Sequence, residues 1–374
     1  MKKYFGNELR ITAEIFFAML ILVCVGSKTF AQTTEIKMVG NRYNFSPIEN
    51  KIQGWIDSDY YSGAAIFIAK DDTVMLEKYF GNYTPSTVAY IASAGKWLAA
   101  AAIAAVVDEG KLGWDDKVNK WLPEFTGIKG EATLRQLLSH TSGYPDYQPP
   151  GAQPDDYQTL KESVAHIVGL TADTVPGAVF HYGGLAMQVA GRMAELATGK
   201  DWETLFEEKI ANPLQMGNTR FTPVDSTPGH NPMLGGGART DLRGYANFLS
   251  MIYYGGLFNG RRILSLKAIK EMQANQVGKA HINHGEYVEN ARHIYRHDIY
   301  GLGEWREEVD AKGNAVLISS PGWAGAYPWI DKKHHIYGFF LARVNLQAAG
   351  KYGFSSFYAS PVLPLLVRDV LKKQ

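Results

Sequence analysis

Apolar and polar positions near both ends of the chain follow the pattern of β-strands. The segment Gly63–Phe80 contains two β-rich runs joined at Asp71 and Asp72, which is typical of a hairpin. Three more β-type runs lie near the C-terminus, at residues 316–319, 327–330 and 336–344. The pattern therefore predicts strands at the two ends of the chain.

Helical patterns dominate the middle of the chain. The predicted helices cover residues 99–109, 133–139, 160–170, 185–197 and 242–254, and a closing helix is expected at 361–373. Gly110 and Gly199 are the stop signals of the first and fourth helices. Strands at both ends of the chain with helices between them predict a mixed α/β fold in which strands and helices are segregated (α+β). We expect an antiparallel sheet from segments at about 45–92 and 300–374, flanked by helices, with an all-α domain inserted at about 93–235.

Composition narrows the function classes only a little. The 374 residues, 46% of them apolar, can bury a large core. Basic and acidic residues nearly cancel to a net charge of +1, without long charged runs. The sequence therefore offers no electrostatic footprint for nucleic acid, and a small molecule is the expected partner.

Residues 1–31 have the features of a secretory signal peptide. Two lysines and an arginine precede the apolar run Ala13–Val25, and a segment typical of a signal-peptide cleavage site follows, ending at Ala31. The run is too short to cross a bilayer comfortably, so a secreted or periplasmic mature chain from residue 32, without a stable membrane span, is expected. The only cysteine, Cys24, lies in this run. Its lipidation is a minor alternative, and the mature chain has no thiol for disulfides or catalysis.

Ser93 is the only serine with a lysine, Lys96, three residues further on. On a helix these positions share one face, so the Lys96 amine can reach the Ser93 hydroxyl. An ammonium cannot accept a proton, so Lys96 acts as a base only if burial lowers its pKa. The first helical turn also favours the negative charge of acyl transfer. A capping serine beside a solvated lysine is the alternative interpretation.

A series of short motifs runs through most of the chain after residue 32. They are the hairpin from Gly63, then Ser93–Lys96, Asp108–Leu112, Leu137–Gly143, Pro176–Tyr182, Gly235–Arg239, Ser320–Tyr327 and Trp329–Asp331. In this order they resemble the serine β-lactamase-like hydrolase family, nearest its class C β-lactamase, penicillin-binding protein and esterase branch. The resemblance implies an antiparallel sheet flanked by helices beside an all-α domain, an active site between them, and no cofactor.

The resemblance also implies a catalytic role for Tyr182, which stands at the tyrosine of the family's Tyr-x-Asn motif. A phenol beside Lys96 can share the proton of the Ser93–Lys96 pair and later activate the incoming water. Without the resemblance, a core aromatic would be the preferred interpretation, because the chain contains 21 tyrosines.

The chain departs from the family pattern at two places. Gly184 replaces the asparagine of Tyr-x-Asn, so no side-chain amide can bridge the lysine and a substrate amide. Ser320, Pro321 and Gly322 stand where the family has Lys-Thr-Gly or His-x-Gly, which leaves at most one neutral hydroxyl for a substrate carboxylate. Recognition of amides and carboxylates is therefore expected to be weakened.

Main-chain donors remain for the developing oxyanion. Gly322 permits a close approach, and the N–H groups of Ser93 and Trp323 are expected to form an oxyanion hole. Four aromatic residues are candidates for an acyl or alcohol pocket, with core packing as the alternative for each: Trp323, Tyr327, Tyr144 and Tyr147.

The remaining candidates receive structural interpretations. His140 and Ser142 are assigned to a turn rather than to a catalytic triad, and His181 either tunes the pH profile or packs. Four histidines are assigned to a loop and not to a metal: His281, His284, His293 and His297. Three arginines would restore carboxylate binding only if they fold inward: Arg292, Arg296 and Arg343.

These observations predict an exported serine hydrolase with a covalent acyl-serine intermediate. Ser93 is acylated, and Lys96 and Tyr182 transfer protons. Esters are the favoured substrates, either as a carboxylesterase or in acyl transfer to an alcohol. A β-lactamase or D-Ala-D-Ala carboxypeptidase is the first alternative. A catalytically inert secreted binding protein is the second.

Overall fold

The computed structural model describes residues 37–38, 43–145, 157–222, 230–282, 296 and 298–373. Residues 35–374 group into one compact unit. Several of the residues singled out above lie outside the described residues, namely the predicted signal peptide with Cys24, together with Tyr147, His284, Arg292, His293 and His297.

The described chain has strands near both ends and mostly helices between them. The helices are α2 (Ser46–Asp57), α3 (Gly95–Asp108), α4 (Val118–Trp121), α5 (Gly127–Gly130), α6 (Leu134–Leu138), α7 (Leu160–Val168), α8 (Leu185–Thr198), α9 (Trp202–Phe206), α10 (Leu242–Tyr253), α11 (Leu266–Gln273), α13 (Leu346–Tyr352), α14 (Ser356–Ala359) and α15 (Val362–Lys372), with a 3₁₀ turn η1 (Ala92–Ala94) and a π-helical turn η3 (Glu207–Ala211). The strands are β1 (Lys37–Met38), β2 (Tyr61–Lys70), β3 (Thr73–Gly81), β4 (Ala89–Tyr90), β5 (Val179–Phe180), β6 (Arg220–Phe221), β7 (Ala238–Thr240), β8 (Leu257–Phe258), β9 (Arg261–Arg262), β10 (His281–Ile282), β11 (Trp305–Val309), β12 (Ala315–Ser319), β13 (Tyr327–Asp331) and β14 (Ile336–Val344).

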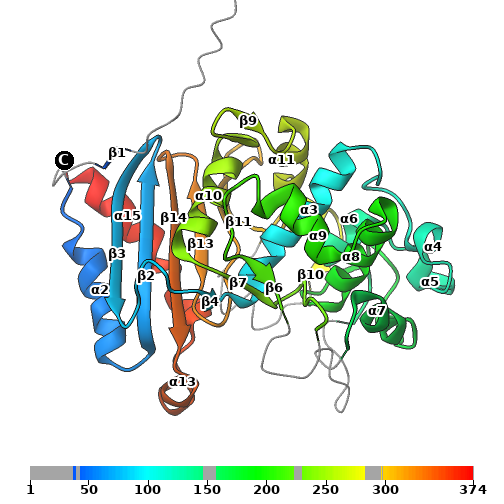
Figure 1. Ribbon diagram of the computed structural model, residues 1–374, viewed down its shortest axis with the longest axis horizontal. Helices are drawn as coiled ribbons and strands as arrows, with labels where there is room; N and C mark the ends of the chain where they lie inside the picture. Colours follow the sequence, from blue (N-terminus) through cyan, green and yellow to red (C-terminus); the bar gives the residue numbers. More distant parts are fainter. Residues whose placement is uncertain are drawn as a thin grey trace, which may run out of the picture. The chain divides into compact units, whose positions relative to one another are not determined.

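The main sheet has seven strands in the order β1-β3-β2-β14-β13-β12-β11. The short β1 pairs in parallel with β3, and every other neighbouring pair is antiparallel. β2 and β3 form the predicted hairpin, and Asp71 at its turn has φ +48°. β14 pairs along β2, so segments from both ends of the chain lie side by side in the sheet (Figure 1). The predicted mixed fold, with an antiparallel sheet and flanking helices, is confirmed.

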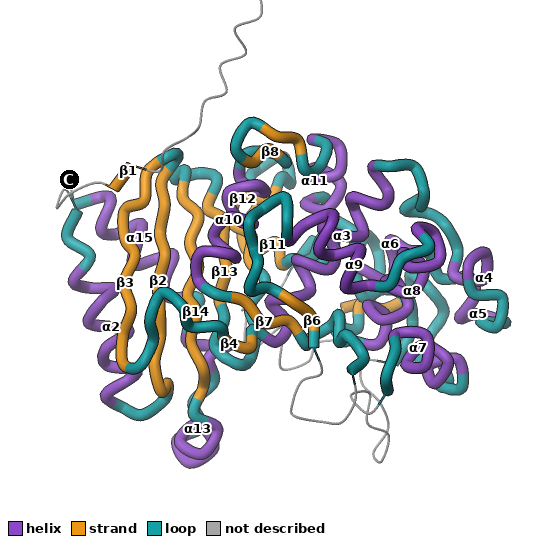
Figure 2. Tube along the Cα trace, in the orientation of Figure 1, coloured by secondary structure: helices purple, strands orange, loops and turns teal. Residues whose placement is uncertain are grey.

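Both faces of β2 are buried because the sheet is covered on both sides. Ala64, Ile66 and Ile68 pack in one cluster with apolar residues of α2 and α15. The alternate positions Ala65, Phe67 and Ala69 pack in a second cluster with residues of α3 and α10. Successive side chains of a strand point to opposite faces, so a strand covered on both sides is apolar almost throughout. Figure 2 shows helices α4 to α9 grouped to one side of the long strands of the main sheet.

Helix α2 was not predicted, and it occupies residues 46–57 at the start of the expected sheet segment. Its sequence is largely polar, but Ile48, Ile52 and Trp55 are buried at helical spacing. Pro47 occupies the first turn, where its missing N–H costs no hydrogen bond. The three apolar residues anchor the helix to the sheet, which explains why a polar segment is ordered here.

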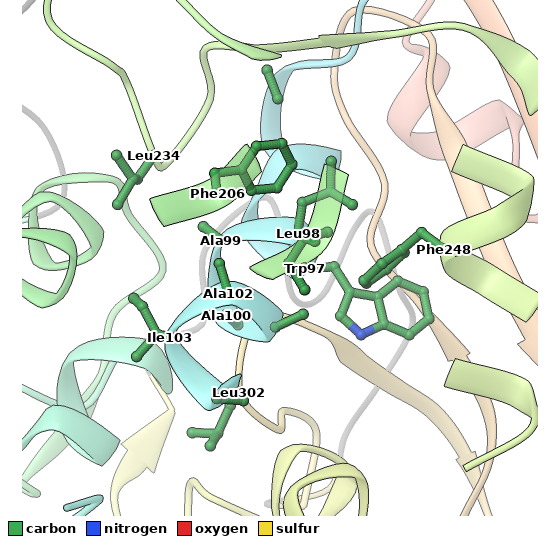
Figure 3. Packing of buried hydrophobic residues seen from close by; sticks show 14 of the residues in the cluster. Trp97, Leu98, Ala99, Ala100, Ala102, Ile103, Phe206, Leu234, Phe248 and Leu302 are labelled. Atoms are coloured by element: carbon green, nitrogen blue, oxygen red, sulfur yellow. The ribbon is translucent and has the colours of Figure 1, made fainter. Parts of the chain in front are cut away.

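Helix α3 is buried on all sides, from Gly95 to Val106. Figure 3 shows Phe206, Leu234, Phe248 and Leu302 around it. Its run of alanines lets these neighbours approach the helix closely, and it positions the start of the helix rigidly. Over the residues that the structure describes, no helix combines the length and hydropathy needed to cross a membrane.

Candidate active site

Ser93 lies in η1, the tight turn between β4 and α3. The preceding residue, Ala92, has φ +48°, a conformation that costs energy for a residue with a Cβ. Main-chain and side-chain hydrogen bonds hold the turn: the Ile91 N–H donates to the Ala238 carbonyl at 2.9 Å, and the Tyr245 hydroxyl donates to the Ala94 carbonyl at 2.7 Å. The serine is therefore presented on a strained but well-supported turn directly before the helix.

Lys96 lies against Ser93 in a fully buried position. Its Nζ is 3.0 Å from Ser93 Oγ, and it also donates to the carbonyl of Gly235. Its side chain is 1% exposed, and this burial lowers the pKa of the amine to about 7. A large fraction of the amine is therefore neutral near pH 7, which is the state that can accept a proton from the serine.

Tyr182 packs over the same amine. The Lys96 Nζ is 4.7 Å from the centroid of the phenol ring. The ring is also in contact with Trp305 and His140, at centroid distances of 5.1 and 4.7 Å. Tyr182 follows β5, and Ser93 and Lys96 come from η1 and α3. The structure thus brings together the three residues to which the sequence assigned the chemistry.

His140 holds the loop that carries Tyr182. It is buried with φ +58°, and its carbonyl accepts the N–H of His181 at 2.8 Å. The Gly183 N–H donates to its Nδ1 at 3.5 Å, which leaves the ring proton on Nε2, 3.3 Å from the Tyr300 hydroxyl. Burial, helped by the nearby Lys96, lowers the pKa of His140 well below its usual value. His140 is therefore a neutral support, in line with its structural assignment.

The main chains of Gly184 and Gly235 pack closely against each other near Lys96. Gly184 caps the start of α8 at φ −115°, and a Cβ added to it would have no atom within 4 Å. A Cβ on Gly235 would lie 2.7 Å from Gly184 Cα. The Gly235 carbonyl is the second acceptor of Lys96. This role could not be predicted from the sequence, because a main-chain acceptor does not depend on residue type.

Ser320 and Gly322 flank the turn of Ser93. The Ser320 hydroxyl donates to the Gly303 carbonyl at 3.1 Å and lies 3.4 Å from the Ser93 carbonyl, and the residue is 2% exposed. This hydroxyl therefore hydrogen-bonds to main-chain oxygens, whereas the sequence predicted that it could bind a substrate carboxylate. A Cβ on Gly322 would lie 2.0 Å from the Ile91 carbonyl, so only glycine permits this approach.

The three described candidates for a pocket, Trp323, Tyr327 and Tyr144, have different environments in the structure. Trp323 is 44% exposed, and its ring meets the edge of Tyr90 at a centroid distance of 5.9 Å. Tyr327 is buried in the core on the α2 face of the sheet. Tyr144 is buried too, and its hydroxyl donates to the Lys129 carbonyl at 2.8 Å. Of the three described residues, only Trp323 is available at the surface, and the core alternative holds for the other two.

The remaining described arginine and histidine candidates are bound to other residues or exposed. Arg296 is bound by Asp298 at 2.6 Å and donates to the carbonyl of Glu307 at 3.1 Å. Arg343 and His281 are exposed. Within the described part of the chain, no group of three or more His, Cys, Asp or Glu side chains could hold a metal ion.

Comparison with known proteins identifies the family of this chain. The family model described as Beta-lactamase matches residues 48–350. A protein of Bacteroides dorei DSM 17855 assigned as a β-lactamase has a crystal structure with a TM-score of 0.84 and 52% sequence identity, covering 88% of this chain and 99% of that chain. A protein of Escherichia coli (strain K12) assigned as a D-alanyl-D-alanine carboxypeptidase is 25% identical over 86% of this chain and 88% of its own length.

A third relative covers less of the molecule. Protein flp of Staphylococcus aureus (strain MW2) is 27% identical over 197 residues, which are 49% of this chain and 40% of flp. The chain thus spans less than half the length of this curated relative. The family model, in contrast, covers the main sheet from β2 to β14, the helices from α3 to α11 and all the residues around Ser93 described above. This chain belongs to the β-lactamase family.

Proposed function

We propose that this protein is a serine hydrolase that cleaves esters through a covalent acyl intermediate on Ser93. Members of this fold family are serine hydrolases. The observation that carries the proposal is the distance of 3.0 Å between Lys96 Nζ and Ser93 Oγ, in a buried setting that lowers the pKa of the amine to about 7. A serine with a neutral amine in hydrogen-bond reach is an activated nucleophile.

The reaction follows from these contacts. The neutral Lys96 amine takes the proton of the Ser93 hydroxyl while Oγ bonds to the acyl carbon, and the negative charge moves to the carbonyl oxygen. The N–H groups of Ser93 and Trp323 receive that oxyanion. The carbon–oxygen bond to the alcohol then breaks, and the alcohol leaves with the proton held by Lys96. In the second half, Tyr182 passes its phenol proton to the Lys96 amine and takes a proton from the water or alcohol that attacks the acyl carbon. The bond from that carbon to Ser93 Oγ then breaks, Lys96 returns a proton to Oγ, and the acid or new ester leaves.

Two features favour esters over amides. Gly184 provides no side-chain amide to hold a substrate amide. The Ser320 hydroxyl is committed to the carbonyls of Gly303 and Ser93, and Pro321 has no polar side chain, so this triplet contributes little to binding a substrate carboxylate. An ester needs neither group, because its alcohol is a good leaving group and its carbonyl requires only the oxyanion donors.

A second candidate activity is hydrolysis of β-lactams or D-alanyl peptides. It is supported by the 52% identity to the Bacteroides dorei protein assigned as a β-lactamase and by the similarity to the Escherichia coli protein assigned as a carboxypeptidase. Both activities would use the same acyl-serine, so only substrate preference separates them from the ester proposal.

We also propose export, which rests on the composition of residues 1–31. Expression of the full chain and of a variant without these residues, followed by cell fractionation, tests it. The full chain should reach the periplasm or the medium in processed form, and the shortened variant should stay in the cytoplasm. An unprocessed full chain in the cytoplasm would contradict export.

The central experiment combines labelling with turnover. A fluorophosphonate probe should label Ser93, and p-nitrophenyl esters should be hydrolysed faster than nitrocefin or D-alanyl peptides. Ser93→Ala should abolish both, whereas Ser86→Ala, at an exposed serine, should change neither. Covalent capture of fluorescent penicillin with fast nitrocefin turnover would favour the second candidate. Absence of labelling and of turnover in the wild-type protein would indicate an inert binding protein and end the proposal.

A further inference from the structure

Glu304 is a buried carboxyl group that the proposed reaction does not use. It stands immediately before β11 and is 0% exposed. Neither of its carboxyl oxygens has a hydrogen-bond partner among the described residues. A buried ionised carboxylate without a partner is strongly unfavourable, so such a group remains protonated or is stabilised by nearby charge.

The groups that face Glu304 come from four elements. The indole of Trp97 on α3 and the phenol of Tyr245 on α10 lie beside it, and the charged groups are Arg306 on β11 and Lys332 after β13. Both cations have other partners. Arg306 donates to three main-chain carbonyls, and Lys332 donates to the Gln273 side chain at 2.5 Å. Among the described residues neither cation forms an ion pair with Glu304.

Burial therefore controls the protonation of this group. It raises the pKa of the Glu304 carboxyl to about 8, against the opposing effects of Lys332, Arg306 and Trp97. At neutral pH the side chain is mostly a neutral carboxylic acid. A neutral acid can stay in this apolar setting, whereas the carboxylate requires water or a closer cation.

The segment that carries Glu304 packs against the turn that carries Ser93 and against the start of α3. Gly303, at φ +78°, packs so closely on the helix start that a Cβ would lie 2.6 Å from the Lys96 carbonyl. The Gly303 carbonyl accepts the Ser320 hydroxyl, which also reaches the Ser93 carbonyl. Tyr245, which faces Glu304, donates to the Ala94 carbonyl. Glu304 thus sits among the groups that hold residues 93–96 in place.

We propose that Glu304 is a positioning residue whose neutral form keeps the Ser93–Lys96 pair in its reactive geometry. Loss of its proton at alkaline pH draws the side chain toward water or toward Lys332, displaces Gly303, and loosens the support of the Ser93 and Lys96 main chain. This inference rests on the proposed serine hydrolase function. It predicts an alkaline decline of activity that originates outside the groups that contact substrate.

The test uses Glu304→Gln in the full protein, because glutamine has the shape of the acid and does not ionise. Wild-type kcat/KM for a p-nitrophenyl ester should fall about tenfold per pH unit above about pH 8. The Glu304→Gln variant should keep its neutral-pH rate within about threefold and lose this decline. Glu304→Met, similar in size and apolar, should give the same flat profile if the glutamine variant folds poorly. Glu308→Gln, on the strand that follows Glu304 but in a surface ion pair with Arg368, should keep the wild-type decline.

Melting temperatures measured from pH 5 to 9 check the same group without catalysis. A carboxyl whose pKa is raised on folding keeps its proton where the unfolded chain has lost it, so its contribution to stability falls as pH rises up to about 8. Over that range, the melting temperature of the wild type should therefore fall relative to that of Glu304→Gln as pH rises. An alkaline decline that persists in Glu304→Gln, or a difference that does not vary with pH, would overturn the inference. A wild type that is neither labelled nor active would instead overturn the proposed function, and the positioning role with it.

Discussion

Gly322 faces the main-chain oxygen of Ile91 so closely that an added Cβ would lie 2.0 Å from that oxygen. Ile91 precedes the turn of Ser93, and Gly322 precedes Trp323, the second proposed oxyanion donor. The contact therefore sets the distance between the two main-chain segments, one leading to Ser93 and one to Trp323, that supply the oxyanion hole. A side chain at residue 322 would force them apart.

Gly322→Ala should consequently reduce turnover more than it reduces substrate binding. Loss of one oxyanion donor costs about 10²- to 10³-fold in kcat. Steady-state kinetics with a p-nitrophenyl ester measure the effect. Gly350→Ala is the matched control, because a Cβ there meets no atom within 4 Å. Equal activity of the two variants would show that residue 322 does not set the oxyanion geometry.

Tyr182→Phe should retain the ring that packs on Trp305 and His140 and lose only the hydroxyl. We expect kcat to fall about 10²- to 10⁴-fold, the usual contribution of a general acid or base, with little change in melting temperature. Tyr144→Phe is the contrasting variant. Its hydroxyl donates to the Lys129 carbonyl, so its loss should lower stability by about 1 kcal/mol and leave turnover unchanged. Full activity of Tyr182→Phe would remove the phenol from the mechanism.

Lys96 predicts the acid side of the pH profile. Burial lowers the pKa of its amine to about 7, so kcat/KM should rise with pH as the neutral base forms and level off between about pH 7 and 8, before the alkaline decline expected from Glu304. The lowered pKa also means that folding releases a proton from Lys96 between about pH 7 and the unfolded pKa of lysine. The free energy of unfolding should therefore rise with pH over that range, as the cost of burying Lys96 falls. Lys96→Arg keeps the charge and cannot lose it, and turnover should fall at least 10²-fold at every pH. A rate that does not depend on pH between 5 and 8 would contradict a lysine base.

Gly184→Asn tests the substrate preference. The residue has an ordinary φ of −115° and open space around its missing Cβ, so an asparagine should be accommodated without loss of the fold. The new amide would lie near Lys96 and could hold a substrate amide. We expect the ratio of nitrocefin to ester turnover to rise about tenfold, the equivalent of one good hydrogen bond. Gly217→Asn, at another open and exposed position, is the control, and an unchanged ratio in Gly184→Asn would contradict the role of the missing side chain.

Patterns that depend on neighbouring residues were readable in the sequence. The β2–β3 hairpin follows from two β-rich runs joined at Asp71 and Asp72. Helices α8 and α10 lie within two residues of their predicted bounds. The approach of Lys96 to Ser93 also follows from local geometry, because two residues three positions apart on a helical turn share a face.

Other properties required contacts between distant segments. The pKa of Lys96 depends on burial by the whole core around α3, and its second acceptor, the Gly235 carbonyl, carries no signature in the sequence. Tyr327 and Trp323 are both aromatic and four residues apart, yet only the fold decides that one is buried and the other exposed.

The sequence by itself determined the β2–β3 hairpin, strands β12 to β14, the central helix and the serine–lysine spacing, because these depend on short-range sterics and on the pattern of apolar residues. Strand β11 at the edge of the sheet was not predicted. Only the tertiary structure decided the direction of the Ser320 hydroxyl, the burial of Glu304 and the convergence of Tyr182 on Lys96. The physical reason is that solvation and hydrogen-bond partners are set by segments far apart in the chain, and these become neighbours only when the sheet and helices pack.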